Sequence, residues 1–216
     1  MLPFEFGAHQ GALRVLALGA HSDDIEIGAG GTILHLIEQG LELDVSWVVV
    51  GAHGKRRQEA EASARAFLAG ASRTQLIFQS YPDSFFPYHG EDIKQGFQRI
   101  AASSNPDLVL THYRNDLHQD HRLVSELTWN AFRNHLILEY EIPKFDGDLG
   151  SPNLFVPLRA ETCRRKLDLL LGCFGSQRDK AWFSDDVFLS LLRLRGVEAA
   201  SPTRYAEAFY ARKVVL

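Results

Sequence analysis

The stretch Arg14–Asp24, which reads RVLALGAHSDD, decides the fold. Its apolar part has the length of a strand, and an uninterrupted apolar run is typical of a strand buried on both faces of a parallel sheet. His21, Asp23 and Asp24 follow directly at the end of this expected strand. Because α/β folds place their binding sites at the carboxyl ends of parallel strands, the stretch predicts both an architecture and a site.

The same alternation of strand and helix patterns continues along the chain. Strands are expected at 44–50, 75–78, 108–111 and 136–142, and helices at about 30–39, 56–68, 93–102, 121–132, 160–171 and 185–195. This alternation indicates βαβ units and a parallel sheet covered on both sides. We therefore predict a single domain over residues 1–216, with a doubly wound, Rossmann-like α/β fold and a mostly parallel sheet. The segment 143–157, rich in Pro, Gly, Asp and Asn, is expected to be a loop.

The composition excludes several classes of function. The 216 residues are 45% hydrophobic and 23% charged, as is ordinary for a soluble enzyme. A net charge of −4 provides no broad basic field, so no nucleic-acid partner is expected. Residues 1–10 lack the basic and apolar regions of a signal peptide, and no stretch approaches the roughly 20 apolar residues of a membrane span. We therefore expect a cytoplasmic protein without a transmembrane segment.

A second group of ionisable residues follows the strand expected at 108–111. The run His112–His121 reads HYRNDLHQDH. In a doubly wound sheet the first and fourth strands can be neighbours where the strand order reverses, and both groups would then open onto one crevice. Imidazole and carboxylate are ligands of catalytic zinc, and three such ligands leave a fourth position for water, whose pKa zinc lowers to about 7. Together the two groups predict a zinc-dependent hydrolase.

Parts of the sequence are also compatible with other functions. The run Gly28–Thr32 has two glycines of a dinucleotide-binding fingerprint but Ile33 in place of its last glycine, so an NAD(P)-binding oxidoreductase is a second hypothesis. A tight turn and close packing of a helix against the sheet explain these glycines better. A module that binds a metal or a sugar without catalysis is a third hypothesis. Asp23 or Asp24 alone could simply cap the next helix.

The two motifs resemble those of a known family. Ala20–Asp24 followed by Gly28–Thr32 resembles the AHPDDE…GxGGT signature of the PIG-L/LmbE-like zinc-dependent de-N-acetylases, and His118–His121 resembles their HPDH motif. Both motifs lack the usual proline, and Ile25 replaces a glutamate whose role therefore has no counterpart here. The resemblance spans most of the chain, because weaker similarity extends to other segments. These are Arg56–Glu59, Asn105–Val109, Ser176-Gln177 and Ala206–Phe209.

The resemblance implies hydrolysis of an N-acetyl group on an N-acetylglucosamine-type amino sugar, with release of acetate and a free amine. It implies one zinc ion per chain, or another divalent metal in its place, bound by His21, Asp24 and His121. Asp23 would be the general base that takes a proton from the metal-bound water. Two more catalytic residues are implied, namely His118, to stabilise the oxyanion or protonate the leaving amine, and Asp120, to orient His118 through a hydrogen bond.

Residues that bind the substrate are expected beside the strand ends and in the 143–157 loop. Arginines near the strand ends could meet a phosphate if the sugar is nucleotide- or lipid-linked, and polar loop side chains could bond sugar hydroxyls. Tyr140 or Phe145 could stack on a sugar face. A merely connecting loop is an equally good explanation of 143–157. The polar candidates are Arg56, Arg57, Arg114, Lys144, Asp146, Asp148 and Asn153.

Overall fold

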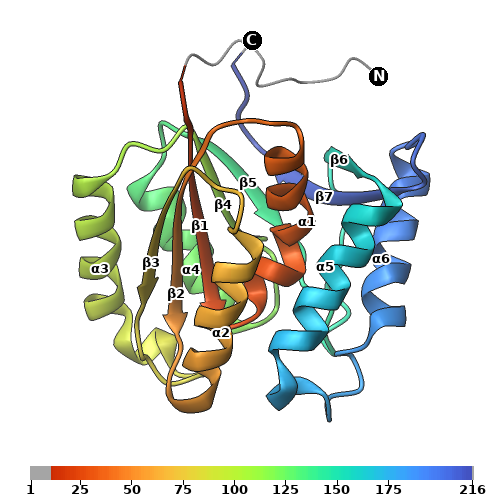
Figure 1. Ribbon diagram of the computed structural model, residues 1–216. Helices are drawn as coiled ribbons and strands as arrows, with labels where there is room; N and C mark the ends of the chain where they lie inside the picture. The colour runs from red at the N-terminus through yellow and green to blue at the C-terminus, as the bar shows by residue number, and fades with distance from the viewer. Residues whose placement is uncertain (1–10, 216) are drawn as a thin grey trace.

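The computed structural model describes residues 11–215, which contain a seven-stranded sheet with helices on both of its faces (Figure 1). The segment 1–10, in which no signal peptide is expected, lies outside the described residues. The strands are β1 Leu13–His21, β2 Leu43–Gly51, β3 Arg73–Phe78, β4 Leu108–His112, β5 Leu136–Tyr140, β6 Leu154–Leu158 and β7 Tyr205–Ala211. The helices are α1 Asp24–Glu38, α2 Gly54–Phe67, α3 Gly90–Ser103, α4 Gln119–Ala131, α5 Ala160–Cys173 and α6 Asp185–Glu198, with short 3-10 helices η1 Phe86–His89 and η2 Gly175–Gln177.

The strands follow the order β3-β2-β1-β4-β5-β7-β6 across the sheet. Strands β1 to β5 pair in parallel, whereas β7 runs antiparallel to both β5 and β6. The order reverses between β1 and β4, which pair directly through Val15 with Leu108 and Ala17 with Leu110. The predicted doubly wound, mostly parallel α/β fold is therefore confirmed, including the contact between the first and fourth strands.

The two larger clusters of the hydrophobic core form layers on opposite faces of the sheet, and a small third cluster contains Leu158, Cys163 and Leu192. One layer includes Ala17, Trp47 and Phe67 and extends to residues of α1, α2, α5 and α6, whereas the other includes Leu18 and Phe97 and involves α3 and α4. Because successive residues of β1 enter opposite layers, the strand is apolar from Val15 to Ala20. The longest described helix, α1, has 15 residues, and none in the described part of the chain has the length and apolar character that a bilayer span requires.

Helix α1 differs from the sequence expectation at its beginning. It starts at Asp24 rather than near residue 30, so Gly28–Thr32 lies inside the helix and the expected tight turn is wrong. The expected close packing is confirmed, because a Cβ atom at Gly28 would lie 2.2 Å from the ring of Tyr140. Glycine therefore allows the helix to approach β5 more closely than any other residue would.

Two strands in the second half of the chain were not predicted. β6 lies partly within the segment expected to be a loop, and β7 inserts between β5 and β6. β6 is an edge strand and contains Pro157, whose missing N–H is tolerated at the edge of a sheet. The loop is therefore shorter than expected, and its two ends are held by β5 and β6.

A buried ion pair fixes α1 from the side of β7. The Glu207 carboxylate accepts hydrogen bonds from the main-chain N–H groups of Gly31 and Thr32 at 2.8 and 2.6 Å. Lys166 of α5 donates to Glu207 and to the carbonyl of Ile27, both at 2.6 Å. Both charged side chains are buried, so these bonds must compensate for the loss of hydration. The pair thereby holds α1, α5 and β7 together.

Substituting alanine for glycine at two helical positions tests the close packing of α1. Alanine ordinarily favours a helix over glycine by about 1 kcal/mol. Gly172→Ala in α5, where an added Cβ meets nothing within 4 Å, should raise the free energy of unfolding by up to about 1 kcal/mol. Gly28→Ala should instead lower it by about 1–3 kcal/mol, because the added Cβ overlaps the Tyr140 ring. Urea unfolding measures both, and a stabilised Gly28→Ala variant would contradict the packing described.

Candidate metal centre

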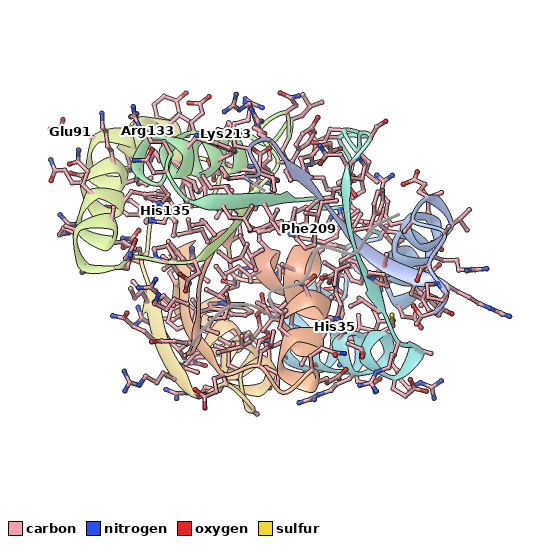
Figure 2. All side chains as sticks on the ribbon, turned by 90° about the horizontal axis from the view of Figure 1, so that it is seen from above. His35, Glu91, Arg133, His135, Phe209 and Lys213 are labelled. Atoms are coloured by element: carbon pink, nitrogen blue, oxygen red, sulfur yellow. The ribbon has the colours of Figure 1, made fainter. Side chains whose placement is uncertain are left out.

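The two groups of ionisable residues meet at the carboxyl ends of β1 and β4. His21 is the last residue of β1 and Asp24 the first of α1, while His121 lies in the first turn of α4. In Figure 1 this is the end of the sheet to which the arrowheads of β1 and β2 point. Two histidines without a predicted role, His35 and His135, lie at the opposite end, which faces the viewer in Figure 2.

Three side-chain atoms form a triangle at this end of the sheet. His21 Nδ1 lies 3.2 Å from His121 Nε2 and 3.5 Å from Asp24 Oδ2, and the last two atoms are 3.6 Å apart. A tetrahedral zinc ion with bonds of about 2.0–2.1 Å separates its ligand atoms by about 3.3–3.4 Å. The three residues are buried, so this spacing is held by the surrounding fold. These donor types at these distances fit a zinc ion.

Each imidazole of the triangle has a carboxylate on its far side. His121 Nδ1 lies 2.9 Å from Asp116 Oδ2, which leaves Nε2 directed toward His21 and Asp24. His21 Nε2 lies 3.1 Å from Asp120 Oδ2 and 3.2 Å from Asp83 Oδ1. A carboxylate behind a histidine fixes its tautomer and orientation, as is usual for histidines that bind metals.

The electrostatics of the triangle also suit a cation. Burial and the neighbouring imidazole of His112 lower the pKa of His121 to about 4, so its ring is neutral near pH 7 and able to bind a metal. Burial alone would raise the pKa of Asp24, but the imidazoles of His121 and His112 hold it well below its ordinary value. Burial would lower the pKa of His21, but the carboxylates around it outweigh burial and raise that pKa. The same carboxylates favour any cation at this position.

Asp23 lies beside the triangle and does not cap a helix. It stands at the N-cap position of α1, yet its side chain makes no capping hydrogen bond. Its Oδ1 accepts a hydrogen bond of 2.7 Å from Arg56, while its buried Oδ2 has no hydrogen-bond partner among the described residues. Burial raises the pKa of Asp23, and the positive charge of Arg56 opposes that rise.

His118 stands at the N-cap of α4, at the edge of the same site. Its Nδ1 accepts a hydrogen bond of 3.2 Å from the main-chain N–H of Asp120, so the proton of the neutral ring is on Nε2. Burial and the imidazole of His21 lower the pKa of His118. The Asp120 carboxylate accepts from the main-chain N–H groups of Ser84 and Phe86 and contacts His21. The hydrogen bond between Asp120 and His118 therefore comes from the main chain of Asp120, while its carboxylate is directed toward His21.

A cleft of about 240 Å³ opens over the triangle. Three of the residues expected to bind substrate line it, namely Arg56, Lys144 and Asp146. Phe145 also lines the cleft and is 79% exposed, whereas Tyr140 is fully buried, with its hydroxyl donating to the Leu18 carbonyl, and is unable to stack on a ligand. The site thus takes part of its wall from the loop after β5.

Four of the polar candidates do not line the cleft, among them Asp148, whose carboxylate pairs with Lys144. Arg57 donates to the Phe78 carbonyl and packs over the ring of the same residue. Arg114 packs over the ring of Trp129. Asn153 exchanges hydrogen bonds with the main chain of Ala211 at the edge of the sheet. Arg57, Arg114 and Asn153 are each held by these contacts with neighbouring residues, and none of the three lines the cleft.

The structure adds residues to the site that were given no role. Buried His112 ends β4, accepts a hydrogen bond of 2.9 Å from the N–H of Ala20 and stacks on His121. Asp116 holds His121, and both belong to the run of ionisable residues after β4, so the composition of that run was a usable signal. Others come from segments without a motif, namely Asp83, Lys180 and Trp182.

The run Gly28–Thr32 does not form a nucleotide-binding turn. It lies in the body of α1 and packs against protein, so its main chain cannot approach a pyrophosphate at the start of a helix. The glycine pattern on which the hypothesis of an NAD(P)-binding oxidoreductase rested therefore gives that hypothesis no support.

Solved structures with the same fold carry different activities in their names. The chain superimposes on N,N'-diacetylchitobiose deacetylase from Pyrococcus horikoshii with a TM-score of 0.67 and 24% identity, covering 93% of this chain and 84% of that one. The A40926 pseudoaglycone deacetylase Dbv21 gives a TM-score of 0.69 and 18% identity, covering 95% and 100%. A 4-carboxy-2-hydroxymuconate hydratase, GalB from Pseudomonas putida KT2440, gives 0.67 and 19%, covering 94% and 98%. At these identities the likeness establishes the fold alone.

Sequence comparison gives a narrower result. The uncharacterized deacetylase YaiS of Escherichia coli strain K12 is 30% identical over an alignment of 139 residues, which covers 60% of this chain and 74% of that protein. The family model for PIG-L, described as GlcNAc-PI de-N-acetylase, matches residues 16–132, which include both groups of site residues. By this match the chain belongs to the PIG-L family of deacetylases.

Proposed function

We propose that the protein is a zinc-dependent hydrolase that removes the N-acetyl group of an N-acetylglucosamine-type amino sugar, releasing acetate and a free amine. The observation that carries the proposal is the triangle of His21, Asp24 and His121, with donor atoms 3.2–3.6 Å apart. These three residues would hold the metal. A bound zinc ion supplies Lewis-acid chemistry and makes water a nucleophile near neutral pH.

Asp23 is proposed as the general base. It lines the cleft beside the triangle, and its Oδ2 has no hydrogen-bond partner among the described residues, so this oxygen is free to accept a proton from the attacking water. Arg56 holds the other oxygen, which fixes the orientation of the carboxylate.

His118 is proposed as the residue that stabilises the oxyanion. Because its Nδ1 accepts the N–H of Asp120, its Nε2 carries a proton and can donate to the oxygen of the acetyl group as negative charge develops there. His118 lines the cleft and is partly exposed.

The walls of the cleft support a sugar substrate. Phe145 and Trp182 offer apolar ring faces, while Asp146 and Lys180 offer groups that can bond hydroxyls. The named activities of two structural relatives, on N,N'-diacetylchitobiose and on an A40926 pseudoaglycone, agree with a sugar conjugate.

Asp23→Asn separates catalysis from metal binding. The substitution should lower the rate of acetate release by about 10²–10⁴-fold, because the base is lost, while zinc content stays at about one ion per chain. Acetate released from N-acetylglucosamine and N,N'-diacetylchitobiose measures the first quantity, and elemental analysis the second. The exposed Asp92→Asn on α3 is the matched control.

Two outcomes would contradict the proposed function. One is wild-type protein without zinc, and the other is unchanged acetate release by the Asp23→Asn variant. Zinc binding without acetate release from a panel of acetylated amino sugars would instead support a binding module without catalysis.

Zinc affinity should fall in a graded way when the triangle and its support are altered. Asp24→Asn removes a proposed ligand and should leave the purified protein nearly free of zinc. Asp116→Asn keeps all three ligands but weakens the support of His121, so it should raise the dissociation constant by about 10–100-fold. Competition with a chromophoric chelator measures both, and equal affinity of Asp24→Asn and wild type would show that the metal is bound elsewhere.

A further inference from the structure

Lys144 makes contacts that neither a connecting loop nor a sugar-binding side chain requires. Its Nζ lies 3.0 Å from Asp116 Oδ2 and also pairs with the Asp148 carboxylate. The same Asp116 oxygen lies 2.9 Å from Nδ1 of His121. The Lys144 side chain is 8% exposed, so this ammonium is almost fully enclosed by its partners. One side chain thus reaches from the loop after β5 to the carboxylate that supports a proposed metal ligand.

The two carboxylates also hold the main chain of the β4–α4 loop. Asp116 Oδ1 accepts a hydrogen bond of 2.8 Å from the N–H of His118, and Asp148 Oδ2 accepts one of 2.7 Å from the N–H of Leu117. The loop after β5 and the loop after β4 are therefore joined at consecutive residues. Lys144 supplies the positive charge between Asp116 and Asp148. We call this set of contacts between the two loops the joint.

The charges explain why the joint needs Lys144. The Asp116 and Asp148 side chains are 3% and 5% exposed, and both bond the same ammonium. Without it two nearly buried carboxylates would face each other, and each would lose its compensating charge. Asp116 is then expected to move away from Asp148, which changes the angle at which it meets His121.

We propose that Lys144 is a positioning residue, which holds the Asp116 carboxylate against His121 and fixes the segment 143–150 as a wall of the cleft. The proposal rests on the proposed function in one respect, since it takes His121 to bind the metal. It assigns the orientation of a metal ligand and the placement of Phe145 and Asp146 to the contacts of a single side chain.

Zinc affinity distinguishes this role from a simple effect of charge. A positive charge near a metal ion repels it, so by charge alone Lys144→Met should tighten zinc binding. By the positioning role, Lys144→Met should raise the zinc dissociation constant about tenfold, and Lys144→Arg, which can still bridge two acids, should stay within about threefold of wild type. The exposed Lys94→Met on α3 changes the net charge equally and should leave the affinity unchanged. Tighter or unchanged binding in Lys144→Met would overturn the proposal.

A double variant tests the mechanism of the joint. Lys144→Met combined with Asp148→Asn removes one positive and one negative charge, so the repulsion on Asp116 disappears. Zinc affinity should then recover most of the loss seen in Lys144→Met alone. A double variant as weak as, or weaker than, Lys144→Met would show that Asp116 is not positioned by this balance of charges.

Proteolysis of the metal-free protein gives a readout that does not depend on zinc. Phe145 is 79% exposed and offers a chymotrypsin site within the fixed segment. Cleavage after Phe145, followed by mass spectrometry, should be at least about threefold faster in Lys144→Met than in wild type or Lys94→Met, because the loop opens more often. Equal cleavage rates would refute the anchoring role. If wild type binds no zinc, the proposed function fails. The cleavage rates of the metal-free protein still test whether Lys144 anchors the segment 143–150.

Discussion

The close packing of α1 against the sheet is the constraint on which the rest of the structure depends. β1 ends in His21 and α1 begins with Asp24, so the position of the helix sets the distance between two of the three candidate ligands. Gly28 lets the helix approach Tyr140, and the Glu207 carboxylate holds it there through main-chain N–H groups. A helix displaced by a side chain at this contact would carry Asp24 out of the triangle.

The site is organised around an excess of carboxylates. Three buried carboxylates contact histidine rings, namely Asp24, Asp116 and Asp120. Asp83 adds a further negative charge beside His21. Such a concentration of buried acids is costly unless cations accompany it. The compensating positive charge can come from protonated histidines, from Lys144 or from a metal ion. The geometry and the electrostatics therefore both favour the binding of a cation at the ends of β1 and β4.

The sequence predicted what depends on local pattern and missed what depends on packing between distant segments. The apolar run of β1 and the polar residues that follow it located the site, since strand ends have a known role in α/β folds. Nothing local shows that Arg56 reaches the cleft while its neighbour Arg57 turns toward Phe78. β7 likewise takes its position in the sheet only through its partners β5 and β6. Asp120 meets His21 because the main chain at Ser84 directs it there.

The contact between Gly31 and Glu207 has a consequence for the order in which the protein is made. The two residues are 176 positions apart, which at usual rates of synthesis corresponds to roughly 10–35 s between their appearances. Until Glu207 emerges from the ribosome, the nascent α1 lacks its anchor, and Lys166 lacks its counter-charge. Closing a loop of this length also costs chain entropy, which this contact must offset when it forms. The candidate metal centre is therefore expected to be completed late in folding, after β7 has been translated.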